Sequence, residues 1–293
     1  MRIHPASGAL TRIELFFHDV ALGHATGFLY SYGQELALVS NWHVFSGRNP
    51  LTKQVTDNRG YKPNRVKFHV TEAQQEKAGI SLFFREMDLY LVEGGQSQWW
   101  QHPGYMDDQG APQLVDIGVL PLSGKIQNFS VMHKVIQSFD AQFIVTTSAN
   151  PDDWTYQQGT VGVGSEVFIL GYPMGLANQG VLPVWKRGSL ASEPLFHIQG
   201  NIPVIYVDAL TRHGMSGSPV IAINQTIIDE SGRRTQIGGE AGGQPWVIGV
   251  YAGRRGSTGD ELEMALGRVW KRSLLDFIFF EHEPGGSEPR LAG

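Results

Sequence analysis

The sequence contains no cysteine, and this absence excludes several kinds of chemistry. Without cysteine the chain forms no disulfide, offers no thiolate nucleophile and builds no Cys-based zinc site. A reducing compartment is compatible with this composition. The first residues, Met1–Gly8, also lack the apolar segment of a secretory signal. We therefore expect a cytoplasmic protein.

Charged residues are scarce as well, at 17% of the chain against about 25% in an average protein. The net charge is −5, and the four pairs of adjacent basic residues are dispersed along the chain and form no run with interleaved aromatic residues. This pattern predicts no nucleic-acid partner. No uninterrupted apolar stretch approaches about 18 residues, so we expect no membrane span and no membrane partner. The sequence predicts no metal ion and no other cofactor.

Glycine is abundant by contrast, with 36 in 293 residues and no repeat. Glycine serves tight turns, so this abundance favours many short strands. Short apolar runs bounded by Gly, Pro, Asn and Ser are typical of such strands. The strand candidates are Ile13–Phe17, Thr26–Tyr30, Leu36–Val39, Arg65–Val70, Asp88–Val92, Leu114–Leu120, Glu166–Leu170, Val204–Val207, Val220–Ile223 and Trp246–Tyr251.

The strand candidates fall into two halves. The composition turns polar around Ala149–Asp153, where we place the boundary. Apolar residues recur with helical spacing from Asp260 to Phe280, which predicts an amphipathic helix. The tail Glu281–Gly293 is expected to be disordered. Strands in two halves, closed by one helix, indicate two β-barrels or a large sandwich.

A serine stands between two glycines in Gly214-Met215-Ser216-Gly217, ahead of the apolar run Pro219–Ile223. A serine hydroxyl is a weak nucleophile unless a base removes its proton and donors stabilise the oxyanion that forms. The glycines allow a sharp turn that leaves the hydroxyl and nearby amides accessible. The same residues also fit a Gly/Ser-rich turn before a strand. The choice depends on whether a base and an acid lie upstream.

Ten histidines could supply the base, and the position of His43 distinguishes it from the others. His43 follows the apolar strand Leu36–Val39 after a short turn, so it would be held rigidly beside a cleft. The alternative is a hydrogen-bonded structural histidine. His69 alternates with lysine and phenylalanine and is interpreted as a strand-face residue. His213 could line a substrate cleft without acting as the base.

An orienting acid should sit at the start of a buried strand, where it can fix the imidazole tautomer and stabilise the imidazolium. Asp116 and Asp88 both fit this context, and either could instead cap a strand or a loop. Asp116 is preferred because the small Gly118 permits close approach and the run after it is uniformly apolar. Asp88 is the second choice.

The order His43, Asp116, Ser216 resembles that of the trypsin-like (chymotrypsin-fold) serine peptidases, whose triad is the established template for this chemistry. The motif Gly-Met-Ser-Gly-Ser-Pro-Val is similar to the nucleophile motif of that family. The likeness is closest to the bacterial branch that includes the HtrA/Deg-type peptidases. Three further stretches resemble strands of this branch: Thr26–Leu29, Phe168–Gly175 and Val247–Tyr251.

The resemblance implies an all-β fold of two six-stranded antiparallel β-barrels with a C-terminal α-helix. Residues 1–150 would form the N-terminal barrel, which carries His43 and Asp116. Residues 151–280 would form the C-terminal barrel, which carries Ser216, together with the helix.

The same resemblance implies a serine endopeptidase that cleaves a peptide or protein substrate through an acyl-enzyme. Ser216 would be the nucleophile, His43 the base and Asp116 the orienting acid. The backbone amides of Gly214 and Ser216 would form the oxyanion hole.

The substrate pocket implied by the family pattern involves Leu210, His213 and Ala252. Neither Leu210 nor Ala252 is acidic, so the family pattern does not favour cleavage after lysine or arginine. A small or modest apolar side chain is expected instead.

The sequence departs from the family at three points. The cysteine that usually stands beside the histidine is absent. Met215 stands where the digestive members carry an aspartate that pairs with a freed N-terminus, so activation by N-terminal cleavage is not expected. We propose that packing of Met215 inside the second barrel holds the loop. We expect no PDZ domain after the predicted helix.

Three other functions stay open. A peptidase-fold binding module, or a peptidase activated by a regulatory protein partner, would have the same sequence features. An esterase could use the same three residues. An α/β-hydrolase is disfavoured, because its order is Ser, acid, His and Ser218 stands where its motif requires glycine.

Overall fold

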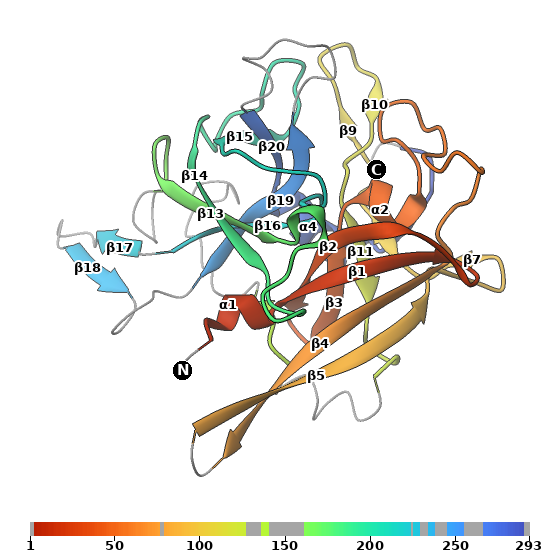
Figure 1. Cartoon of the computed structure of the whole chain (residues 1–293). Coiled ribbons are helices and arrows are strands. Elements are labelled where there is room, and N and C mark those ends of the chain that lie inside the picture. The colour runs from red at the N-terminus through yellow and green to blue at the C-terminus, as the bar shows by residue number, and fades with distance from the viewer. Residues whose placement is uncertain are drawn as a thin grey trace.

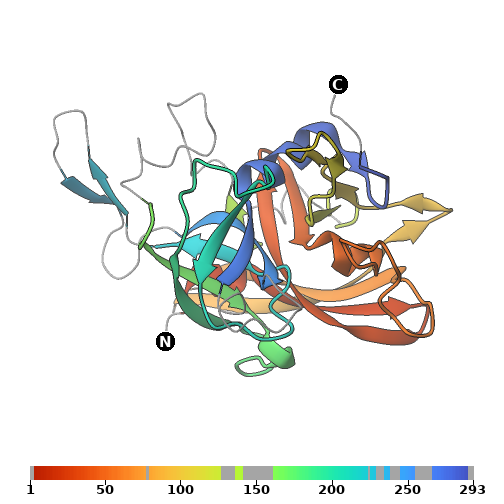
Figure 2. The same cartoon turned by 90° about the horizontal axis from the view of Figure 1, so that it is seen from above.

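The computed structural model describes residues 3–76, 79–126, 136–140, 161–223, 225–228, 234–237, 245–254 and 266–289. They form two β-rich halves that lie side by side, coloured red to yellow and green to blue (Figures 1 and 2). The boundary predicted around Ala149–Asp153 lies outside the described residues. Among the helices in the described ranges, none is long and apolar enough to cross a membrane.

The first half is built on long antiparallel strands. These are β1 (Leu10–Phe17), β2 (Val20–Tyr32), β3 (Glu35–Ser40), β4 (Arg65–Glu76) and β5 (Gly79–Tyr90), with the shorter β11 (Gly118–Pro121). The two-residue strands are β6 (Val92–Glu93), β7 (Gln96–Ser97), β8 (Trp100–Gln101), β9 (Tyr105–Met106), β10 (Pro112–Gln113) and β12 (Phe139–Asp140). Two short helices, α1 (Pro5–Gly8) and α2 (Trp42–Ser46), complete this half.

The main sheet of the first half has nine strands. Its order is β21-β8-β11-β3-β2-β1-β4-β5, and β12 pairs with β2. The strand β21 (Glu283–Pro284) comes from the end of the chain. A six-stranded first barrel is therefore not confirmed, since the pairings among the described residues leave β5 and β21 at the two ends of a larger sheet.

The second half contains a closed six-stranded barrel of order β13-β14-β15-β20-β19-β16. Its strands are β13 (Glu166–Gly171), β14 (Val184–Leu190), β15 (Val204–Asp208), β16 (Pro219–Ala222), β19 (Trp246–Arg254) and β20 (Leu266–Lys271), and a separate hairpin pairs β17 (Gln225–Ile228) with β18 (Arg234–Ile237). All six barrel pairings are antiparallel. The predicted all-β fold with a six-stranded barrel is confirmed here.

The helix predicted over Asp260–Phe280 is corrected in its extent. Residues 266–271 form the barrel strand β20, and the helix α4 covers only Arg272–Glu281. Val269 points into the barrel core while Trp270 packs between the two halves, which is the alternation of a strand. Valine and tryptophan favour strands, and apolar spacing alone did not distinguish this short segment from the helix after it.

The tail is ordered up to residue 289, which corrects the expectation of disorder for this part of it. Glu283 pairs with Gln101 and Pro284 with Trp100, so β21 extends the first sheet. A β-strand partner that distant in sequence leaves no local signal, and the polar composition of the tail therefore suggested disorder.

A hydrophobic core cluster lies between the halves. It combines Phe28 and Val119 of the first half with Leu170 and Val250 of the second. Helix α4 joins the same junction. The Tyr30 hydroxyl donates a hydrogen bond to Asp276 Oδ1 at 2.6 Å and accepts one from Arg272 Nε at 2.9 Å.

Candidate active site

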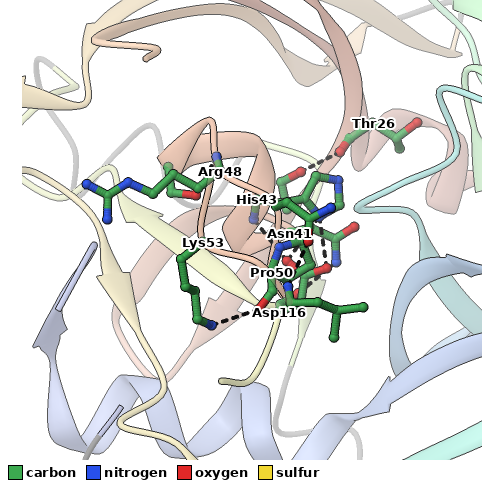
Figure 3. Close-up of polar contacts among 11 residues, drawn as sticks. Thr26, Asn41, His43, Arg48, Pro50, Lys53 and Asp116 are labelled. Atoms are coloured by element: carbon green, nitrogen blue, oxygen red, sulfur yellow. Dashed lines mark hydrogen bonds and ion pairs between the residues drawn. The ribbon is translucent and has the colours of Figure 1, made fainter. Parts of the chain in front are cut away.

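His43 and Asp116 meet at the junction, and the contact is direct. His43 lies in the first turn of α2, immediately after β3, and Asp116 lies just before β11. The Nδ1 atom of His43 is 2.8 Å from Asp116 Oδ2 and 3.0 Å from Oδ1 (Figure 3). The Asp116 side chain is 1% exposed, whereas the His43 side chain is 27% exposed. A buried carboxylate thus faces the ring of a histidine that reaches solvent.

The local backbone fixes this pair. The His43 amide donates to Asp116 Oδ1 at 2.9 Å, and Asn41 Nδ2 donates to the Asp116 carbonyl at 2.7 Å. Gly118 pairs with Ser40 in the sheet, and a Cβ atom at Gly118 would lie 2.7 Å from the Phe45 ring. The close approach predicted for Gly118 is confirmed, because any larger residue would push α2 away from β11.

Asp88, the second choice for the acid, lies elsewhere. Its carboxylate is 3.4 Å from Arg65 Nε and 3.5 Å from Lys67 Nζ, and its side chain is 40% exposed. It belongs to β5, whose partner in the sheet is β4. Asp88 therefore forms surface ion pairs, and only Asp116 contacts His43.

Burial and charge act in opposite directions on His43. Burial lowers the pKa of the imidazole, and the positive charge of Arg268 also lowers it. The charge of Asp116 and its hydrogen bond raise the pKa, and together they prevail, so that the pKa of His43 is above its ordinary value of 6.5. Asp116 therefore stabilises the imidazolium form, which is what a general base needs after it has accepted a proton.

The loop that carries Ser216, residues 211–218, is called the serine loop. It reaches the same junction from the second half. The Thr26 amide of β2 donates to the Ser216 carbonyl at 3.2 Å. Gly217 has φ +83°, and a Cβ atom there would clash with Ser40, the last residue of the strand that leads to His43. Ser216 itself is half-buried. The glycine after the serine thus lets the loop approach β2 and the end of β3 closely.

Two backbone amides of the loop have no acceptor among the described residues. Within the described ranges, neither the Gly214 amide nor the Ser216 amide donates a hydrogen bond. The His213 carbonyl accepts a hydrogen bond from the Met174 amide at 2.7 Å. Because the peptide bond is trans, the Gly214 N–H points away from that carbonyl. Free, fixed amides of this kind can receive a developing oxyanion.

Gly214 needs its missing side chain for this arrangement. Its φ is +92°, and a Cβ atom would lie 2.6 Å from the Tyr172 carbonyl oxygen and 3.0 Å from the Met174 nitrogen. The turn Pro173–Gly175 that follows β13 therefore packs directly against the serine loop.

Thr26, a fully buried residue of the first sheet, contacts both the serine loop and the segment before the turn Pro173–Gly175. Its hydroxyl donates to the Gly214 carbonyl at 2.8 Å and accepts from the Tyr172 amide at 3.0 Å. Its own carbonyl accepts from Ser40 Oγ at 2.8 Å. Thr26 was not predicted as a site residue, although the stretch Thr26–Leu29 resembles a strand of the family. The partners lie 188 and 146 positions away, so no local pattern predicts them.

Met215 is buried in the core of the second barrel with 0% exposure. Its amide donates to the Arg212 carbonyl at 3.3 Å, and its carbonyl accepts from the Ser218 amide at 3.1 Å. The predicted packing of the methionine is confirmed. Burial of an uncharged thioether anchors the loop without an ion pair.

The three residues predicted for the substrate pocket differ in their surroundings. Leu210 is 63% exposed and lines a surface groove with Glu166, Arg187 and Asp208. His213 is exposed, and Ala252 is buried at 9%. The structure therefore gives Leu210 an outward position on the barrel.

No protein-family model and no curated protein matches the chain. Solved structures similar to it include the Rv3671c protease of M. tuberculosis in its inactive form, with 14% identity and a TM-score of 0.43 over 96% of this chain and 91% of that one. Deg5 matches with 16% identity and a TM-score of 0.41 over 92% and 87% of the two chains. The serine endoprotease from Yersinia pestis matches with 12% identity and a TM-score of 0.42 over 94% and 63%. At these low identities and TM-scores the likeness carries no argument about the reaction, which must be inferred from the site.

Proposed function

We propose that the protein is a serine endopeptidase that hydrolyses peptide bonds through an acyl-enzyme. The observation that carries the proposal is the contact of the half-buried His43 ring with the buried Asp116 carboxylate, at the junction that also receives the Ser216 loop. The free amides of Gly214 and Ser216 support it. Among the described residues no hydrogen bond joins the Ser216 hydroxyl to His43. The serine loop reaches β2 through the hydrogen bond from the Thr26 amide, and it reaches the end of β3, the strand that leads to His43, through the close approach of Gly217 to Ser40.

In the proposed reaction, Ser216 Oγ attacks the carbonyl carbon of the scissile bond, and His43 Nε2 takes the hydroxyl proton. The amides of Gly214 and Ser216 hold the oxyanion. His43 then gives its proton to the departing amine, and the C–N bond breaks to leave the acyl-enzyme. A water molecule then attacks the ester carbonyl while His43 accepts a proton from it. His43 returns this proton to Ser216 Oγ as the C–Oγ bond breaks, which releases the acid product and restores the free serine.

The test is turnover of matched peptide and ester substrates by the wild-type protein. We expect hydrolysis of internal peptide bonds in a peptide library, measured by mass spectrometry of the products. Ester turnover without peptide turnover would identify an esterase instead. Binding of peptides without turnover of either substrate would favour the binding module. Turnover that needs an added protein fraction would identify a partner-activated peptidase.

The raised pKa of His43 predicts the pH dependence of kcat. Below that pKa the ring is protonated and cannot accept the serine proton, so kcat should rise with pH through it. We expect the midpoint of this acid limb above 6.5, the ordinary pKa of histidine. Initial rates measured at saturating substrate in constant-ionic-strength buffers give the profile. A midpoint at or below the ordinary value would contradict the assigned role of Asp116.

Thr26→Val should lower kcat roughly 10- to 100-fold with a smaller effect on KM, because it removes a buried hydroxyl that fixes the Gly214 carbonyl. The Gly214 residue, and with it the amide that would face the oxyanion, would then be held less firmly against the first sheet. Thr26→Ser keeps the hydroxyl and should restore most of kcat. The comparison requires steady-state kinetics of both variants and a thermal unfolding curve for each. Equal kcat for the valine and serine variants would rule out this positioning role.

A further inference from the structure

The space beneath the serine loop is occupied by a side chain of the chain itself, that of Tyr251. Backbone hydrogen bonds place this residue of β19 against the nucleophile. The Gly217 amide donates to the Tyr251 carbonyl at 3.0 Å, and the Tyr251 amide donates to the Ser218 carbonyl at 2.8 Å. The strand position of Tyr251 is therefore fixed next to Ser216.

The Tyr251 ring extends from β19 beneath the loop toward β20. It is 1% exposed and belongs to the core cluster that also contains Met215 and Val269. Its hydroxyl forms a short hydrogen bond with Thr211 Oγ1, at the start of the serine loop. On the β20 side, a Cβ atom at Gly267 would lie only 2.6 Å from Tyr251 Cε2. The ring thus fills the gap between the serine loop, β19 and β20, and Gly267 makes room for it.

β19 lies directly beside the serine loop, because Gly217 and Ser218 are hydrogen-bonded to Tyr251. If the amides of Gly214 and Ser216 hold a substrate carbonyl, a side chain of that residue directed into the barrel would therefore meet the Tyr251 ring. The ring is held by a hydrogen bond at its tip and by packing along its edge, so displacing it would break both. A large substrate side chain could enter only by breaking this hydrogen bond and this packing. The side chains of glycine, alanine and serine are short enough to fit above the ring.

We infer that Tyr251 closes the pocket for the substrate residue on the acyl side of the scissile bond, and that it restricts this residue to glycine, alanine or serine. The inference rests on the proposed peptidase function. The sequence led us to expect a small or modest apolar side chain. The Tyr251 ring also excludes leucine and phenylalanine. Leu210, with its exposed side chain, plays no part in this selection.

The experiment compares peptide substrates that differ only in that residue: alanine, leucine or phenylalanine. For the wild type we expect kcat/KM for the phenylalanine substrate at least about 100-fold below that for alanine, since excluding even one methylene-sized group costs roughly 10- to 200-fold. Tyr251→Ala should raise the phenylalanine-to-alanine ratio at least about 10-fold. Tyr251→Phe keeps the ring and loses the hydroxyl, so it should keep the wild-type preference.

Fluorophosphonate labelling of Ser216 is measured in parallel, because it reports the nucleophile whatever the substrate residue. Labelled wild-type protein that cleaves after phenylalanine as readily as after alanine would overturn the role of Tyr251 and leave the peptidase function standing. An unchanged ratio of kcat/KM for the phenylalanine and alanine substrates in Tyr251→Ala would also overturn the role of Tyr251. If that variant does not fold, Tyr251→Leu, which leaves less volume empty, carries the same comparison. Absence of both labelling and turnover in the wild type would overturn both proposals.

Discussion

Replacing Ser216 with alanine is expected to lower kcat for peptide hydrolysis by several orders of magnitude, on the order of 10⁶-fold, with little change in KM. The hydroxyl is the atom that forms the acyl-enzyme, and no other group in the reaction can take its place. The fold should be unaffected, because the Ser216 side chain makes no hydrogen bond within the described residues and its carbonyl still accepts from Thr26. Initial rates with a peptide substrate, together with a thermal unfolding curve, provide the measurement.

Ser218→Ala is the matched control for this experiment. Ser218 lies in the same loop, but its hydroxyl is fully buried and unpartnered in the described structure. It contacts the protein interior rather than substrate, so its removal should change kcat by less than about 3-fold. Equal losses in the two variants would mean that the loop is sensitive to any change, and a fully active Ser216→Ala variant would exclude Ser216 as the nucleophile.

Asp116→Asn is expected to lower kcat at neutral pH by about 10⁴-fold. The asparagine has nearly the same shape, but its amide group cannot hold His43 in the required tautomer or stabilise the imidazolium. Without the carboxylate, burial and Arg268 both lower the pKa of His43 unopposed. The residual activity should therefore have an acid limb at lower pH than the wild type. The measurement is the pH profile of kcat for both proteins.

Asp88→Asn provides the control for a lost carboxylate. Its partners are Arg65 and Lys67 of the neighbouring strand β4, and the Asp88 side chain is partly exposed, so the variant should lose only the small contribution of a surface ion pair to stability. We expect its kcat and acid limb to match those of the wild type. A large effect at Asp88, or a minor one at Asp116, would reverse the assignment of the orienting acid.

The sequence was sufficient to predict the strands whose apolar residues alternate. Leu36–Val39 and Glu166–Leu170 fall within β3 and β13, because strands that face a core on at least one side carry a clear pattern. The closure of the second half into a barrel was predicted through the resemblance and is confirmed. The nine-stranded sheet of the first half was not predicted, since its strand β21 comes from the far end of the chain.

The predicted site residues differ in how much the sequence could reveal about them. The contact between His43 and Asp116 was predicted, because each residue borders a strongly apolar strand of the same half. The contacts of Thr26 and the buried position of the Tyr251 ring were not predicted. Both depend on hydrogen bonds to residues far away in the sequence, and Tyr251 also depends on the absence of a side chain at Gly267. Such determinants become visible only once the strands have been placed.

The most direct measurement is labelling of the wild-type protein with a fluorophosphonate probe, followed by mass spectrometry of the modified peptide. We predict a single adduct on Ser216, which forms faster as His43 loses its proton and which is absent in Ser216→Ala. A wild-type protein that does not react, or equal labelling of the alanine variant at another residue, would contradict the account.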